Sequence, residues 1–154
     1  MITLAAAGAG FLIAVLWFDL MFDVQTRHRA GNVLPGSVLA SITSYYRRVT
    51  TEASPMGRLV GGVMLLLLFS LGAEIFSGKL DWWITWPSLA AATCAIALSL
   101  ARTVRNAVRL GSSADPPEVQ TRLARAIYRD HLFCLAAMTL VVALQIAAPW
   151  VTDR

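Results

Sequence analysis

Four long stretches without a charged residue are the feature that most limits how this chain can fold. They cover residues 1–18, 59–73, 82–101 and 132–152. A helix that crosses a bilayer needs about 20 consecutive apolar residues, with a range of about 17–25. The second stretch reaches that length only if Glu74 lies at its end. The pattern predicts four transmembrane helices, at about residues 2–22, 57–77, 83–103 and 129–149.

The composition agrees with a membrane environment. Of the 154 residues, 57% are apolar and 14% are charged, whereas a soluble domain has about 25% charged residues. A chain with so little polar surface cannot cover an apolar core in water, while lipid removes that need. We therefore predict an all-α membrane protein in which residues 1–154 form a single four-helix transmembrane domain.

The arginines set the expected orientation. Eleven of the 13 Lys and Arg residues lie in the first and third connecting loops. Because cytoplasmic loops are enriched in Lys and Arg, this bias predicts a bacterial inner-membrane protein with both loops in the cytoplasm and both termini outside. A basic chain can also indicate nucleic-acid binding, but no nucleic-acid-binding motif accompanies these arginines. The lipid bilayer is therefore the expected partner, and nucleic acid is not.

The first loop is long enough to hold a helix of its own. Apolar residues recur at helical spacing after Pro35 and Gly36, which indicates an amphipathic cytoplasmic helix that lies at the membrane surface. These residues are Val38, Leu39, Ile42, Tyr45, Tyr46 and Val49.

The third loop reads as two helix extensions joined by a turn. The third helix is expected to continue to Leu110 and to end with Gly111 in the left-handed conformation. No helix breaker occurs between Pro116 and Pro149, so the fourth helix should be longer than ~50 Å.

Ionisable residues gather at the predicted cytoplasmic ends of the four helices. Asp19 and Asp23 are four residues apart and therefore share one helix face, and an antiparallel bundle brings the other members to the same level. Ionisable groups at a membrane boundary are costly and normally pair or face water. This cluster is therefore the candidate ligand-binding site. Its members are Asp19, Asp23, Arg58, Arg102, Arg105, Arg129, Asp130 and His131.

Several interpretations of the cluster stay open. In the first, its acids neutralise its arginines and tie the helices together, as in a structural subunit of a larger membrane complex. In the second, the arginine stripes bind an anionic ligand, either a phosphate-bearing lipid headgroup or metabolite, or an acidic partner protein, because the planar guanidinium suits bidentate phosphate contacts. The stripes are Arg102, Arg105 and Arg109 on the third helix and Arg122, Arg125 and Arg129 on the fourth.

A third interpretation is a membrane-embedded enzyme. Asp19, Asp23 and His131 are weak candidates to ligate a divalent metal, with Asp130 or His28 as further ligands, or to act as acid and base. The nearby arginines would repel a cation, and no catalytic residue or cofactor is identified. A transport pathway would have to use Glu74 at the outer end of the second span.

Small residues suggest how helices associate. Gly57, Gly61 and Gly62 begin the second span, and small residues at such spacing let transmembrane helices approach closely. They are compatible with a homo-oligomer as well as with packing inside one bundle.

Short segments of the chain resemble a family of known architecture. "WFDLMFDVQ", "YYRRVTTEASPM", "RNAVRLG" and "RDHL" resemble segments of an uncharacterised bacterial family of small four-span integral membrane proteins. The resemblance covers most of the chain. It implies the four-span fold, and it brings no assigned activity or functional residue.

Overall fold

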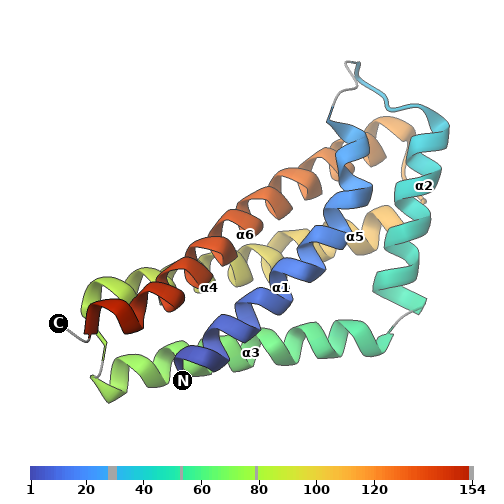
Figure 1. Cartoon of the computed structure of the whole chain (residues 1–154). Coiled ribbons are helices and arrows are strands. Elements are labelled where there is room, and N and C mark those ends of the chain that lie inside the picture. The colour runs from blue at the N-terminus through green and yellow to red at the C-terminus, as the bar shows by residue number, and fades with distance from the viewer. Residues whose placement is uncertain (28–30, 53, 79, 153–154) are drawn as a thin grey trace.

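The chain folds into a bundle of long helices. The computed structural model describes residues 1–27, 31–52, 54–78 and 80–152, and this part of the chain contains no strand. The long helices run side by side (Figure 1). They are α1 (Ile2–Asp23), α3 (Ser54–Ser77), α6 (Pro117–Thr152), and α4 (Trp82–Leu98), which continues through the π-helical η3 (Ser99–Thr103) into α5 (Val104–Gly111).

Four of these helical stretches are long and apolar enough to cross a membrane. They are Ile2–Thr26, Pro55–Ser77, Trp82–Gly111 and Pro117–Pro149, and each contains one of the four predicted spans. Their outward side chains are large and apolar: Leu65 is 71% exposed, Phe69 66% and Phe76 93%. Lipid tails are the environment that suits such a surface. The prediction of an all-α, four-helix membrane bundle is confirmed.

The membrane-spanning part has its own apolar core. Helix α1 lies against α3 and α6, and α4 lies against α3 and α6. Alanines line the contact on α1 and α4, which lets the backbones approach closely. The buried residues are Ala5, Ala9, Leu12, Leu67, Leu71, Ala92, Ala95, Cys134, Ala137, Met138 and Val141.

A second core lies at the end of the bundle that α2 (Gly36–Arg47) covers, here called the α2 end (Figure 1). The amphipathic helix predicted in loop one is thus confirmed. Its apolar face, however, packs against α5 and α6 rather than against the membrane surface, because the two helix extensions offer it an apolar partner. This core consists of Leu34, Val38, Leu39, Ile42, Tyr46, Ala107, Leu110, Leu123, Ala124 and Ile127.

Gly111 ends α5 for a reason other than the one expected. The residue with a left-handed backbone is Ser113, at φ 55°, so the prediction that Gly111 adopts this conformation is wrong. A Cβ on Gly111 would lie 2.7 Å from the backbone nitrogen of Arg47. Glycine is needed there because the α2 backbone packs directly on it, and the guanidinium of Arg47 donates back to the Gly111 carbonyl at 3.4 Å.

The fourth helix is as long as the sequence predicts. Helix α6 has 36 residues, which corresponds to ~54 Å at 1.5 Å per residue. Its first half carries the arginine stripe and belongs to the α2 end, and its second half is apolar. One helix therefore connects the polar end of the bundle to the opposite end, where the chain termini lie (Figure 1).

Gly57, Gly61 and Gly62 take no part in close packing within the described bundle. A Cβ added to any of them would meet nothing within 4 Å. Association with a second copy through this face stays a prediction.

Candidate functional site

Two carboxylates, two phenols and an imidazole form one network at the α2 end. Asp19 and Asp23 lie on the last turns of α1, Tyr45 and Tyr46 lie near the end of α2, and His131 lies on α6. The hydroxyl of Tyr45 donates to Asp19 Oδ1 at 2.7 Å. The hydroxyl of Tyr46 donates to Asp23 Oδ1 at 2.7 Å. The network, called here the Asp–His–Tyr network, ties three helices together.

His131 lies between the two carboxylates. Its Nδ1 is 2.7 Å from Asp23 Oδ2, and its Nε2 is 3.8 Å from Asp19 Oδ2. An imidazolium donates from both nitrogens, whereas neutral histidine donates from one. A ring with a carboxylate facing each nitrogen therefore suits the imidazolium form, which also balances part of the negative charge.

The centre of the network is closed to solvent. Asp23 is 0% exposed, Tyr46 2% and His131 6%, while the side chain of Asp19 keeps 18% exposure. Burial, together with the negative charges of Asp19 and Asp23, raises the pKa of Tyr45 and that of Tyr46 well above the ordinary value of 10.0. Both phenols therefore remain neutral donors to the carboxylates, and Phe22 stacks on the Tyr45 ring with centroids 4.0 Å apart.

Asp130, next to His131 in the chain, has partners on the neighbouring helix. Its Oδ2 accepts from the Thr103 hydroxyl at 3.2 Å and lies 3.3 Å from Arg102 Nε. Both partners belong to η3. A π-helical turn changes the direction of the side chains that follow it, and here two consecutive residues reach the same carboxylate.

The predicted cluster is thus divided by the structure. Asp19, Asp23 and His131 meet in the Asp–His–Tyr network, and Arg102 and Asp130 form the adjacent pair. The other three candidates, Arg58, Arg105 and Arg129, are exposed, and no described residue forms an ion pair with them. His28 lies outside the described residues.

Sequence reasoning missed the role of Tyr45 and Tyr46. It assigned them to the apolar face of the loop-one helix, and for Tyr46 that assignment holds because its ring is part of the second core. Their hydroxyl groups reach Asp19 and Asp23 only because α2 crosses the end of α1. The sequence signal that could have indicated these contacts was the presence of two adjacent tyrosines, which can donate hydrogen bonds, and of two aspartates that need donors near the same end of the bundle.

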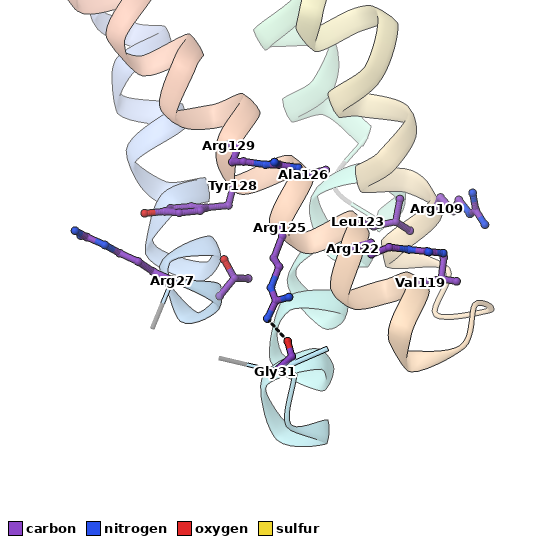
Figure 2. Close-up of a pocket in the computed structure, with 11 residues that line it drawn as sticks. Arg27, Gly31, Arg109, Val119, Arg122, Leu123, Arg125, Ala126, Tyr128 and Arg129 are labelled. Atoms are coloured by element: carbon purple, nitrogen blue, oxygen red, sulfur yellow. Dashed lines mark hydrogen bonds between the residues drawn. The ribbon is translucent and has the colours of Figure 1, made fainter. Parts of the chain in front are cut away.

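A groove rich in arginine runs beside this network along the first half of α6. It has a volume of about 890 Å³. Figure 2 shows Arg125 extending to Gly31, with Arg27 and Tyr128 on one side and Arg122 and Arg109 on the other. The residues that line this groove, the arginine groove, are Thr26, Arg27, Gly31, Arg109, Val119, Arg122, Leu123, Arg125, Ala126, Tyr128 and Arg129.

Two arginines of the groove have defined partners. Arg109 donates two hydrogen bonds of 2.7 Å to Asp115, and these bonds lower the pKa of that carboxyl. Arg125 donates to the Gly31 carbonyl at 2.8 Å. The guanidinium groups of Arg27, Arg122 and Arg129 form no hydrogen bond or ion pair with any part of the chain that the structure describes, and none of the described residues that line the groove is acidic.

The donor atoms expected to ligate a metal are used otherwise. Oxygens of Asp19 and Asp23 accept from tyrosine and face His131. Among the described residues, no group of three or more His, Cys, Asp or Glu side chains is arranged to hold a metal ion.

Comparisons with known proteins found no family model, curated protein or solved structure that matches the chain. The resemblance to an uncharacterised four-span family therefore rests on the quoted segments alone. The chain is a membrane-spanning helical protein with a buried hydrogen-bonded network and an arginine groove at one end.

Proposed function

We propose that the α2 end faces the cytoplasm and that the arginine groove binds the phosphate-bearing headgroup of an anionic membrane lipid. The observation that carries this proposal is the charge of the groove. Among the described residues, five arginines line it and no acid does. Guanidinium groups bind phosphate through paired, charge-assisted hydrogen bonds, so three of them without a described partner supply a strong anion site.

The position of the groove favours a lipid over a free metabolite. Tyr128 and Arg129 lie where α6 passes from its polar half into the apolar stretch that begins at Leu132. Tyrosine and arginine at such a boundary belong at headgroup level. A headgroup held there would reach Arg122 and Arg129 on α6 while its tails remain in the bilayer.

The Asp–His–Tyr network contributes by positioning the groove. Arg27 follows α1 four residues after Asp23, and Arg129 precedes His131 by two residues on α6. The 2.7 Å contact between Asp23 and His131 therefore fixes the distance between the two sides of the site. In this proposal Asp19, Asp23, Arg102, Asp130 and His131 hold the frame. Arg129 binds the ligand, and Arg58 and Arg105 lie outside the groove and do not contact it.

Removing two groove arginines should reduce the amount of anionic lipid that stays with the purified protein. We expect Arg122→Gln with Arg129→Gln to lose most of the anionic phospholipid retained in mild detergent, measured by lipid extraction and mass spectrometry. The helical content should not change, because both side chains are exposed. Retention by the wild type should also weaken with added salt, since salt screens exposed charges.

The matched control is Arg58→Gln with Arg105→Gln, which removes the same charge from exposed positions outside the groove. Equal loss in both double variants would mean attraction to the whole basic surface and would contradict a specific site. A retained phosphorylated metabolite, or an acidic protein that copurifies in place of lipid, would assign the groove to the other ligands that its charge can bind.

The orientation has its own test. A single-cysteine protein, with Cys94 and Cys134 replaced, can carry Ser112→Cys at the α2 end or Asp81→Cys at the other end. Both positions are exposed. A membrane-impermeant maleimide added to intact spheroplasts should label position 81 at once and position 112 only after permeabilisation. The reverse pattern would place the arginine groove on the outer side and remove the basis for the proposal.

A membrane-embedded enzyme is the second candidate, favoured by one observation. His131 contacts Asp23 at 2.7 Å, which is the arrangement that a histidine acting as acid or base needs. The burial of Asp23, Tyr46 and His131 leaves a substrate only the exposed edge of Asp19. For this reason we assign the network a positioning role.

A further inference from the structure

We propose that Glu74, with Gln145 and Ser88, forms a proton-binding site in the half of the bundle that holds the chain termini. This inference is independent of the lipid site. Gln145 lies 14 residues beyond His131 on α6, or ~21 Å along the helix axis, so the two polar regions are separate.

Three oxygen atoms at this place have no hydrogen-bond donor. Glu74 is 3% exposed and Gln145 is 0% exposed. Both carboxyl oxygens of Glu74 and Oε1 of Gln145 are buried and have no hydrogen-bond partner among the described residues. Buried polar atoms are normally paired. Three unpaired acceptors on two neighbouring side chains therefore indicate that a donor belongs between them.

The surroundings limit what that donor can be. Gln145 lies within hydrogen-bonding reach of the Glu74 side chain, but no described donor meets hydrogen-bond geometry at either carboxyl oxygen. The Nε2 of Gln145 donates instead to Ser88 Oγ at 3.4 Å. Ser70, also buried, donates its hydroxyl to the Leu66 carbonyl at 2.8 Å. Neither of these described bonds is directed at the carboxyl group.

Few charged groups act on Glu74. Among the described residues, the charge that acts on it is that of the α-amino group of Met1, at the start of α1. There is no other Asp, Glu, Lys, Arg or His in the surrounding stretches, which are residues 2–18 on α1, 59–77 on α3, 82–98 on α4 and 132–152 on α6. Asp81 precedes α4, but it is exposed and accepts from the Trp83 indole at 3.3 Å.

A single proton on Glu74 provides a hydrogen-bond partner for these unpaired oxygen atoms. An ionised carboxylate without a partner is very costly in an apolar interior, and such groups neutralise instead. A proton on one oxygen of Glu74 turns that oxygen into a donor, and Gln145 Oε1 is the adjacent acceptor. The second hydrogen of Gln145 Nε2 can then serve the other carboxyl oxygen. Neutral Glu74 thus pairs α3 with α6, and loss of the proton leaves a charge inside the bundle.

Carbodiimide labelling of the full chain in proteoliposomes tests the proposal. The O–H of a carboxylic acid adds across one C=N bond of dicyclohexylcarbodiimide, and the adduct rearranges to a stable acylurea. An exposed glutamate is almost fully ionised at pH 7, because its ordinary pKa is about 4.3. We expect Glu74 to be the main labelled residue at pH 7, identified by peptide mass spectrometry. Exposed Asp81 and Glu118 serve as controls within the same molecule.

A variant and a change of salt complete the labelling experiment. Glu74→Gln, which is neutral and of the same shape, should lose the adduct and keep the unfolding temperature of the wild type. Sodium chloride in place of choline chloride should not change the labelling. An unlabelled Glu74 in folded wild-type protein between pH 5 and pH 8 would overturn the proposal, and protection by sodium would assign the site to a metal cation instead.

Discussion

Replacing Asp23 with alanine should lower the free energy of unfolding by about 3–5 kcal/mol, the usual cost of removing one partner from a buried charge pair. Asp23 is fully buried and serves two groups at once. Its Oδ2 faces His131 Nδ1, and its Oδ1 accepts from Tyr46, each at 2.7 Å. The substitution leaves a buried imidazole and a buried phenol without their partner. It also removes the link between α1, α2 and α6.

The measurement is an unfolding titration in mixed micelles, followed by circular dichroism. Asp115→Ala is the matched control, since it removes the same charge and breaks two hydrogen bonds of 2.7 Å to Arg109. That pair is exposed on the Arg109 side, and exposed ion pairs contribute little. Equal unfolding midpoints for the two variants would show that the network does not hold the α2 end.

The two adjacent tyrosines should differ in their effect on stability. Tyr46→Phe should cost about 1.5–3 kcal/mol, the range for a hydrogen bond to a charged group, because it removes the donor to fully buried Asp23. Tyr45→Phe removes a bond of the same length, but its acceptor Asp19 keeps 18% side-chain exposure, so water can replace the lost donor. The same unfolding titration measures both variants. Equal costs would contradict the assignment of Asp23 as the centre of the network.

The pH dependence of stability provides a second readout of Tyr46. Burial first, and then the charges of Asp23 and Asp19, raise its pKa in the folded protein above the ordinary 10.0. The contribution of this group is therefore complete below pH 10 and is lost as the pH rises through the folded-state pKa. Wild-type stability should fall more steeply above pH 10 than that of Tyr46→Phe.

The apolar pattern was sufficient to predict the membrane helices and α2. Runs without a charge have few alternatives to crossing the bilayer, and the helical spacing from Val38 to Val49 fitted only one local structure. The pattern did not show what the apolar face of α2 would cover. That depended on how far α5 and α6 extend beyond the spans, and on Gly111, which allows the α2 backbone to approach.

The members of the site were harder to predict than its level in the bundle. Antiparallel helices place Asp19, Asp23 and His131 at one height, and the structure brings them into one network. Which arginines pair with acids depends on details that spacing does not contain. Arg102 reaches Asp130 from a π-helical turn, and Arg109 is occupied by Asp115 in a turn. Such partners are decided by tertiary structure. The sequence therefore did not show that the arginine groove is separate from the predicted cluster of acids, arginines and His131.

The most direct test of lipid binding in the arginine groove is headgroup photocrosslinking. The protein would be reconstituted with a trace of anionic phospholipid that carries a diazirine in its headgroup, irradiated, and mapped by peptide mass spectrometry. We predict crosslinks concentrated on residues 119–129 and around Arg27, and competition by unlabelled anionic lipid but not by phosphatidylcholine. Crosslinks spread over both ends of the bundle, or equal yields from a zwitterionic probe, would contradict a headgroup site in this groove.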